Sequence, residues 1–269
     1  MDLREMYHYI FLEQSYPLTR EWPLFSSPWP LMLITLGYIY FVLYAGPRYM
    51  KDRPPYELKT FILIYNMIQI LANLWFVKEH ISLGWFSEFS IICGQRDEVL
   101  MHSKTNVIKL FNVGWWMFLL RLFDYVETCV FVLRKKQNQV SALHIYHHVS
   151  ILVLGWYYFK FILDERITFG SLLNCTVHVI MYTYYFLAAW SPELQQMISP
   201  IKLYITKLQM VQFIVVIIIM LQIFNPNCQA PPLVKGSAVF FIGNILIFLY
   251  LFYDFYKKTY TTLPKQKNN

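Results

Sequence analysis

Long apolar stretches, separated by polar connections, dominate this chain of 269 residues. A transmembrane helix needs about 20 consecutive apolar residues, and seven stretches approach that length. The pattern therefore predicts an all-α polytopic membrane protein with seven transmembrane helices, in one integral membrane domain over residues 1–269. The predicted helices are residues 30–46, 60–78, 109–133, 141–162, 168–190, 202–224 and 236–256.

The composition supports a membrane protein and argues against a soluble one. Hydrophobic residues make up 57% of the chain, charged residues make up 14%, and the mean hydropathy is +0.39. Soluble domains carry about 25% charged residues. The formal net charge is +7, but the basic residues gather at the ends of the apolar stretches. We therefore expect them to orient the protein in a lipid bilayer and to bind anionic groups, and we expect no nucleic acid partner.

The distribution of basic residues also predicts the orientation. The cluster Arg134, Lys135 and Lys136 directly follows the third apolar stretch, which favours a cytosolic position for that end. The N-terminus is then lumenal and the C-terminus cytosolic. Lys265 and Lys267 are the fifth and third residues from the C-terminus, the spacing of a dilysine retrieval signal. We expect a multi-pass protein of the endoplasmic reticulum membrane.

The four cysteines divide between connections and helices. Cys93 and Cys228 fall in two connections on the predicted lumenal side, where an oxidising environment permits a disulfide between them. Cys129 and Cys175 fall inside predicted helices, where we expect small packing residues. We expect no cysteine in the polar stripes described next, which argues against a catalytic thiolate.

The third apolar stretch carries charges at membrane depth. Each isolated charge at a helix centre costs about 2.5–3.5 kcal/mol, so these residues must face a polar interior and pair. At about 100° per residue, Arg121, Asp124, Glu127 and Thr128 share an arc of roughly 120°. They therefore form one stripe that is expected to point inward.

Three further stretches carry polar stripes of the same kind. His144, His147 and His148 in the fourth stretch stand at i, i+3 and i+4, so they share a helix face. Four histidines on two adjacent helices, accompanied by carboxylates and amides, are poorly explained as packing residues. The fifth and sixth stretches add Asn174, His178, Tyr182 and Tyr185, and Thr206, Gln209 and Gln212.

The spacing His-x-x-His-His also occurs in membrane di-iron desaturases and hydroxylases, so a metal-dependent lipid oxidase is the alternative. Such a site needs histidines from several boxes, but only four of the seven histidines lie on predicted inward faces. That number is too small for two irons unless carboxylates substitute, although one zinc ion remains possible. We expect no metal and no cofactor.

Four segments together resemble the signature boxes of the ELO family, the very-long-chain fatty-acid elongases of the endoplasmic reticulum. They are RLFDYVET, QVSALHIYHH, HVIMYTYY and TKLQMVQ, which begin at residues 121, 139, 178 and 206. The family's third-helix box reads Lys-x-x-Glu-x-x-Asp-Thr, whereas this chain has Arg121, Asp124, Glu127 and Thr128. Every charge keeps its sign, but each charged side chain changes in length.

The resemblance implies condensation of a long-chain fatty acyl-CoA with malonyl-CoA, giving a 3-ketoacyl-CoA, CoA and carbon dioxide. It implies that the later six helices enclose a narrow acyl tunnel. The implied partners are the reductase and dehydratase of the elongation cycle and, in a homodimer, a second copy of the chain. Gln139, directly before the histidine box, is similar to the residue found there in the branch of the family that acts on longer acyl chains. We expect the tunnel wall to include Phe111, Trp115, Leu152, Trp156 and Phe213.

The chemistry suggests roles within these boxes. The resemblance implies that His147 is the nucleophile, since a neutral imidazole can attack a thioester and form an acyl-imidazole. CoA would leave first, which predicts a ping-pong scheme, and His178 would orient His147 or shuttle a proton. The candidate donors to the enolate are His144, His148, Asn174 and Gln209, and the candidate cations for the CoA phosphates include Arg134, Lys135 and Lys202.

Two other classes fit the sequence less well. A seven-helix receptor has no need for four histidines, paired charges and glutamines that converge at the cytosolic half. A transporter remains an alternative that an assay for carbon dioxide release from malonyl-CoA would separate from the enzyme.

Overall fold

The computed structural model describes residues 2–87, 104–162, 165–228 and 230–261, and the regular elements of these ranges are helices. The helices that run along the bundle are α3 (Trp29–Tyr40), η2 (Phe41–Ala45), α4 (Gly46–Met50), α5 (Lys59–Ser82), α6 (Lys104–Phe123), α7 (Tyr125–Leu133), α8 (Ala142–Tyr157), η5 (Tyr158–Ile162), α9 (Glu165–Trp190), α11 (Ile201–Leu221), η6 (Gln222–Phe224), α12 (Pro232–Tyr256) and η7 (Lys257–Thr261). The shorter elements are α1 (Leu3–His8), η1 (Tyr9–Glu13), α2 (Pro17–Arg20), η4 (Gln137–Gln139) and α10 (Pro192–Ile198).

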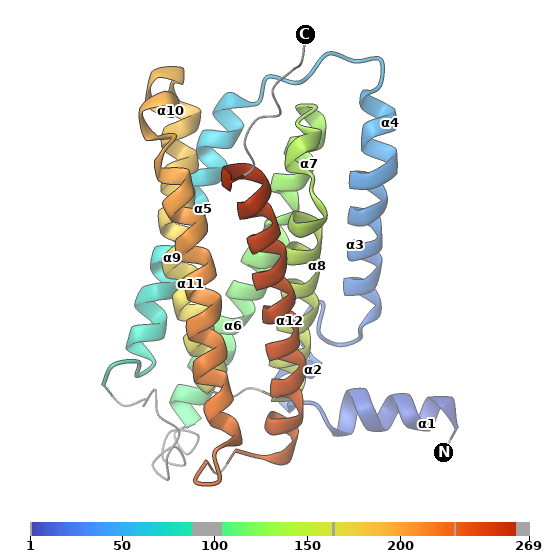
Figure 1. Cartoon of the computed structure of the whole chain (residues 1–269). Coiled ribbons are helices and arrows are strands. Elements are labelled where there is room, and N and C mark those ends of the chain that lie inside the picture. The colour runs from blue at the N-terminus through green and yellow to red at the C-terminus, as the bar shows by residue number, and fades with distance from the viewer. Residues whose placement is uncertain (1, 88–103, 163–164, 229, 262–269) are drawn as a thin grey trace.

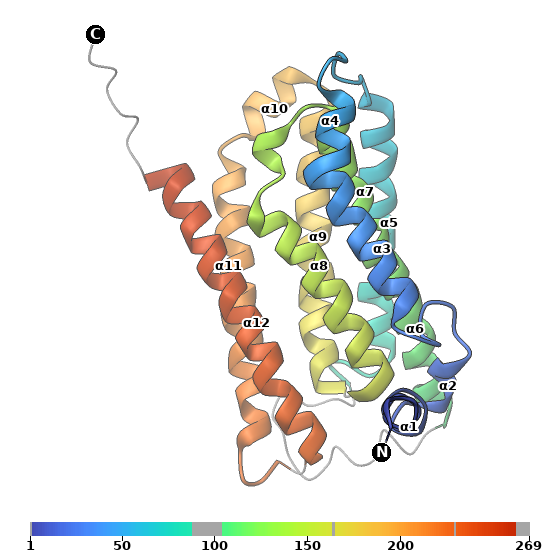
Figure 2. The same cartoon turned by 90° about the vertical axis from the view of Figure 1, so that its right-hand side faces the viewer.

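The helices form an elongated bundle with their axes side by side (Figure 1). The first long helix, α3 with η2 and α4, lies at one edge, and α11 and α12 lie at the opposite edge (Figure 2). The element α1 lies across one end of the bundle, and η7, the last described element, lies toward the other end (Figure 1).

All seven predicted stretches are helical, and the class of all-α membrane protein is confirmed. Five helical segments are long and apolar enough to cross a membrane: Trp29–Met50, Lys59–Ser82, Thr168–Trp190, Ile201–Phe224 and Pro232–Thr261. The other two predicted spans lack this property because polar residues reduce their hydropathy. One is broken at Asp124, between α6 and α7, and the other carries the histidine triplet. A count of seven crossings therefore stays a prediction.

The first helix is longer than its sequence pattern indicates. We expected the proline-containing connection to begin at residue 47, but the helix continues as α4 to Met50. Pro47 stands inside this continuous helical run, directly after the π-helical turn η2, where the altered hydrogen-bond pattern accommodates a residue that has no backbone N–H. The connection between α4 and α5 is therefore residues 51–58.

The segment before α3 is bonded to the end of α8. Lys160, in η5, is fully buried, and its Nζ donates a hydrogen bond of 2.6 Å to the backbone oxygen of Phe25. The indole N–H of Trp156 donates to the backbone oxygen of Leu24 at 2.8 Å, and the hydroxyl of Tyr16 donates to that of Ile162 at 3.0 Å. These bonds hold the N-terminal segment against the outside of α6 and α8.

This packing corrects the predicted tunnel wall. Four of the five residues expected there do not line the cavity described below, and three of the four pack against aromatic rings of the N-terminal segment. The ring pairs are Trp22–Phe111 at 5.8 Å, Phe25–Trp115 at 5.9 Å and Phe25–Trp156 at 6.0 Å, measured between centroids, and the fourth residue, Leu152, is fully buried in the same core. Phe213 alone of the five lines the cavity.

Some predictions fall partly outside the described residues. Cys228 is buried and disulfide-bonded, but Cys93 lies outside the described residues, so their pairing stays a prediction. Lys265 and Lys267 also lie outside them. Cys129 and Cys175 are free thiols within helices, as expected.

Candidate active site

Arg121 and Asp124 form a buried ion pair where α6 meets α7. Nη1 of Arg121 lies 3.0 Å from Oδ2 of Asp124, and both side chains are almost fully buried. The pair is completed from α5, where Gln69 donates to Oδ1 of Asp124 at 2.7 Å and Asn73 accepts from Nη2 of Arg121 at 3.0 Å. Two members of the predicted inward stripe, Arg121 and Asp124, therefore pair and are satisfied by hydrogen bonds, as buried charges require.

The two amides on α5 were missed by the sequence reasoning, although a signal was present. Asn66, Gln69 and Asn73 stand at i, i+3 and i+7 in an otherwise apolar stretch, which places them on one helix face. All three are buried. A polar stripe within an apolar helix indicates a polar neighbour, and here that neighbour is the charged stripe of α6.

Arg121 also connects α6 to α9. Its Nη1 lies 2.8 Å from Nδ1 of His178, and its Nη2 lies 3.8 Å from the sulfur of Cys175. The expectation that no cysteine lies in the polar cluster is therefore wrong, because Cys175 packs against the guanidinium. Its thiol does not line the cavity, however, so a thiolate nucleophile gains no support.

The histidine triplet lies next to this network. His144 and His148 have ring centroids 4.2 Å apart, and Nε2 of His144 lies 3.0 Å from the hydroxyl of Thr128. That hydroxyl accepts a hydrogen bond of 2.9 Å from Tyr38 on α3. The rings of His147 and His178 are 6.4 Å apart, so the two helices present their histidines to each other.

Three residues of this region can hold a metal ion. Ligand atoms of Glu127, His144 and His148 all lie within 4.8 Å of one another, and Nδ1 of His148 has no hydrogen-bond partner among the described residues. Two imidazoles and a carboxylate can provide the protein ligands of one zinc ion but are too few for two irons. His147 and His178 lie outside this group, and the absence of a metal stays a prediction.

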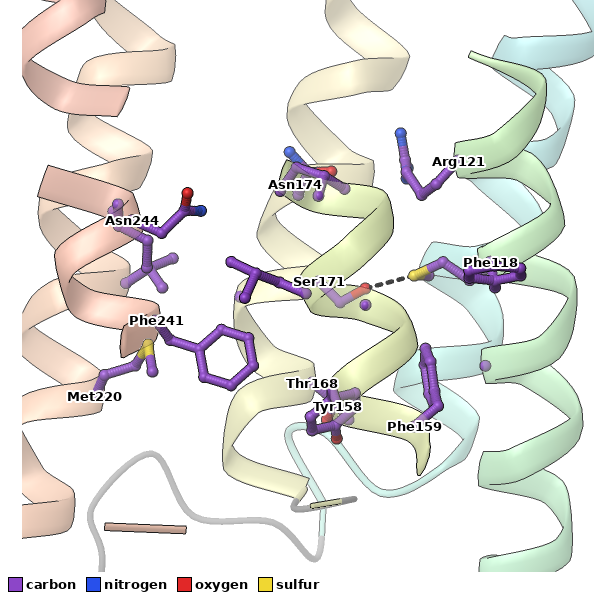
Figure 3. A pocket seen from close by; sticks show the side chains of 18 of the residues that line it. Phe118, Arg121, Tyr158, Phe159, Thr168, Ser171, Asn174, Met220, Phe241 and Asn244 are labelled. Atoms are coloured by element: carbon purple, nitrogen blue, oxygen red, sulfur yellow. Dashed lines mark hydrogen bonds between the residues drawn. The ribbon is translucent and has the colours of Figure 1, made fainter. Parts of the chain in front are cut away.

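A cavity of about 200 Å³ lies between the later six helices, which each contribute to its wall. Its lining is mostly apolar. Arg121 and Asn174 lie at one end, called here the polar end, while Tyr158, Phe159 and Thr168 lie at the other (Figure 3). The polar lining residues that match the predicted stripes are Arg121, His147, Asn174 and Gln212. Asn244 on α12 was not predicted; it lines the cavity and accepts a hydrogen bond of 2.8 Å from Tyr146.

The other predicted polar residues surround the cavity without lining it. Tyr182 is buried, with its ring perpendicular to that of His178 at 5.7 Å. Tyr185 packs against Tyr182 but is 37% exposed, and the amide of Gln209 contacts the sulfur of Met181 at 3.5 Å. Nδ2 of Asn174 lies 3.5 Å from Nε2 of His178.

The predicted phosphate-binding cations lie elsewhere. Arg134 is the residue at the C-terminal end of α7, and exposed Lys135 donates to the backbone oxygen of Lys51 at 3.2 Å. Lys202 begins α11 and lies 5.9 Å from the ring of Phe255. The structure does not bring these three residues to the cavity, and their role in binding CoA stays a prediction.

Known proteins are similar in sequence to this chain over nearly its whole length. A very long chain fatty acid elongase of Aedes aegypti is 35% identical over 264 residues, covering 97% of this chain and 71% of the relative. Very long chain fatty acid elongase 1 of Mus musculus is 31% identical over 258 residues, covering 95% of this chain and 90% of the relative. The model of the ELO (GNS1/SUR4) family matches residues 23–268, which contain every charged, histidine and amide residue of the site. On this match, the chain belongs to the ELO family.

Proposed function

We propose that this protein is an enzyme of fatty acid elongation that condenses a long-chain fatty acyl-CoA with malonyl-CoA. The products are a 3-ketoacyl-CoA, CoA and carbon dioxide. The observation that carries the proposal is the position of His147. Of the four histidines in the two boxes, it is the one that lines the cavity, and it lies among apolar walls suited to an acyl chain. The relatives, all named as very long chain fatty acid elongases, support the same reaction.

The first half-reaction forms an acyl-enzyme. A nitrogen of His147 attacks the thioester carbonyl, the carbon–sulfur bond breaks, and CoA leaves as the thiol with the proton that the imidazole loses. An acyl-imidazole is more reactive than a thioester, so the acyl group stays activated. The apolar walls exclude water from this intermediate, which protects it from hydrolysis.

The second half-reaction extends the chain. Malonyl-CoA loses carbon dioxide, and the carbon of the resulting enolate attacks the acyl carbonyl. The carbon–nitrogen bond then breaks and the imidazole regains a proton from solvent. Negative charge develops on oxygen in both halves, so preorganised donors such as Asn174 and the nearby histidines stabilise it.

The direct test measures condensation by the purified protein. Labelled malonyl-CoA and a panel of acyl-CoAs are supplied, and the release of carbon dioxide is followed together with formation of the 3-ketoacyl-CoA. Release that depends on an acyl-CoA supports the proposal. Movement of acyl-CoA across vesicles without any release would show a transporter, and activity that vanishes with a chelator and returns with zinc or iron would favour the metal-dependent alternative. The relatives do not favour that alternative.

We place the enzyme in the endoplasmic reticulum membrane, with a lumenal N-terminus and a cytosolic C-terminus. The reductase and dehydratase of the elongation cycle would act on its product, and a homodimer fits the same proposal. The ends of α4 and α12 and the start of α11 lie at one end of the bundle (Figure 1), and each of these ends carries basic residues. Protease protection of tags at the two termini in sealed microsomes tests this orientation.

The cavity also predicts a change in the acyl chain that the enzyme accepts. Gly155 lines the cavity two turns beyond His147 on α8, about 12 Å along the helix axis. A Cβ atom built on Gly155 meets no atom within 4 Å, so a larger side chain there enters open space. We expect Gly155→Leu to reduce elongation of the longest accepted acyl-CoAs by at least about tenfold while shorter ones are still extended, since apolar chains are discriminated by the space available.

The matched control for this prediction is Gly243→Leu on α12. A Cβ at Gly243 also meets no atom within 4 Å, but this residue does not line the cavity. The control should keep the wild-type profile of products when both variants are assayed with acyl-CoAs of graded length. Equal loss of activity at all lengths in Gly155→Leu would contradict the assignment of this cavity to the acyl chain.

A further inference from the structure

His178 is held by a group that can only donate hydrogen bonds. Nη1 of Arg121 lies 2.8 Å from Nδ1 of His178, and a guanidinium has five N–H donors and no acceptor. Nδ1 must therefore be the accepting nitrogen of the ring. A neutral imidazole with an accepting Nδ1 carries its single proton on Nε2. The contact thus selects one of the two tautomers of His178.

Arg121 cannot turn away from this contact without losing others. It also donates to Asp124 and Asn73, both at 3.0 Å, and its side chain is 7% exposed. The two carboxylate oxygens of Asp124 are already used, one by Arg121 and one by Gln69. A doubly protonated His178 would place two cations 2.8 Å apart. Because Asp124 and Asn73 hold Arg121 in this position, the contact also favours the neutral ring of His178.

Nε2 of His178 lies beside the cavity, although His178 is not one of the residues that line it. This nitrogen is 3.5 Å from Nδ2 of Asn174, which lines the cavity together with His147 and Arg121. The rings of His178 and His147 are 6.4 Å apart. An oxygen of a substrate bound at His147 would therefore lie next to an N–H group. The unprotonated nitrogen that a general base needs is directed at Arg121 instead.

We propose that Arg121 is a positioning residue that holds His178 as the tautomer protonated on Nε2, so that His178 donates a hydrogen bond to the oxygen that gains negative charge and does not act as a general base. This inference rests on the proposed condensation and decides between the two roles left open for His178. A neutral imidazole that donates from a fixed position stabilises developing charge without transferring its proton. The recorded neighbour of Nε2 is the amide nitrogen Nδ2 of Asn174, which is also a donor. The proposed tautomer therefore requires the amide to be turned by 180°, so that Oδ1 of Asn174 accepts the hydrogen bond from Nε2–H while no substrate is bound.

The activity test compares three replacements of His178. A glutamine side chain can place an N–H near the position of Nε2 but cannot act as a base, whereas alanine provides neither function. Loss of one such donor costs about 10²–10³-fold in rate, so His178→Ala should fall by this factor and His178→Gln should keep at least about tenfold more activity. His178→Asn, whose amide reaches only the position of Nδ1, should resemble alanine. Equal rates for the glutamine and alanine variants would overturn the proposal.

A spectroscopic test reads the tautomer without any reaction. The protein is labelled with ¹⁵N-histidine, and the signal of His178 is identified by its absence in His178→Gln. The wild type should show an unprotonated Nδ1 and a protonated Nε2. Arg121→Lys, which keeps a donor, should retain this pattern, and Arg121→Met should show a mixture of tautomers. If the single replacement does not fold, Arg121→Met combined with Asp124→Leu removes both charges and serves instead.

The two tests separate failure of this inference from failure of the proposed function. A protonated Nδ1 in the wild type, or an unchanged tautomer in the methionine variant, overturns the role of Arg121 whether or not the protein condenses malonyl-CoA. A correct tautomer in a protein that releases no carbon dioxide leaves the geometry intact and rejects the reaction.

Discussion

Replacement of His147 by alanine should abolish condensation and acyl transfer together. In the proposed reaction the imidazole of His147 forms the covalent bond to the acyl group, and no other group replaces it at the polar end of the cavity. Loss of a covalent nucleophile lowers the rate by at least about 10³-fold in comparable enzymes. The wild type, incubated with acyl-CoA alone, should gain the mass of one acyl group, and His147→Ala should gain none.

Because the acyl-enzyme forms from acyl-CoA alone, this prediction can be tested without malonyl-CoA. Intact-mass measurement detects the acyl group, and peptide mapping should locate it on His147. A suitable control is His8→Ala, because His8 is exposed and lies in the N-terminal segment, away from the cavity. That variant should keep both the adduct and the activity. An acyl adduct of normal amount in His147→Ala would show that another residue is the nucleophile.

Replacement of Asp124 by leucine should cause the largest loss of stability. This change leaves the guanidinium of Arg121 buried without the carboxylate that lies 3.0 Å away, and it removes the acceptor for Gln69. Breaking one member of a buried pair costs about 3–5 kcal/mol, because the remaining charge is unpaired in a medium that solvates it poorly. Thermal unfolding in detergent, followed by the fraction that remains monodisperse, should show a clear decrease in the midpoint.

Two companion variants test the reason for this loss. Arg121→Met with Asp124→Leu removes both charges and should recover much of the stability, since a paired deletion leaves no unpaired group. Glu127→Gln is the matched change at the neighbouring carboxylate. The side chain that could pair with Glu127 is the imidazole of His148, whose Nε2 lies 3.9 Å from Oε2 of Glu127, too far for a hydrogen bond, so this change should have a small effect. A double variant less stable than Asp124→Leu would show that the pair acts through packing and not through charge.

Helix periodicity accounts for how well the site could be predicted. The stripes on α6, α8 and α9 share faces because positions three and four apart in an α-helix lie on the same side. Arg121, His147 and His178 were therefore expected to converge, and the structure brings them together. Periodicity does not reveal which helix a stripe meets. The partners Gln69 and Asn73 became evident only when α5 was seen against α6.

The residues that were wrongly expected to line the cavity can also be explained physically. Phe111, Leu152 and Trp156 are apolar residues of helices that surround the cavity, and the sequence contains no sign of which apolar face is turned inward. The N-terminal segment covers the opposite face of α6 and α8, so these residues pack against it. Similarly, helix periodicity places His144, His147 and His148 on one face without showing which of them lines the cavity, and only the resemblance singled out His147. The rotation of α8 selects His147 for the cavity and leaves His144 and His148 beside Glu127.

The sequence alone therefore determined the class of protein, the helical stretches and the set of polar residues that had to be buried together. These follow from local hydropathy and from the cost of an unpaired charge in a membrane, which are properties of each segment. Only the tertiary structure decided which histidine of the two boxes lines the cavity, which amides complete the ion pair and which nitrogen of His178 accepts a hydrogen bond. Those depend on the rotation and contact of helices far apart in sequence, which packing of the whole bundle sets.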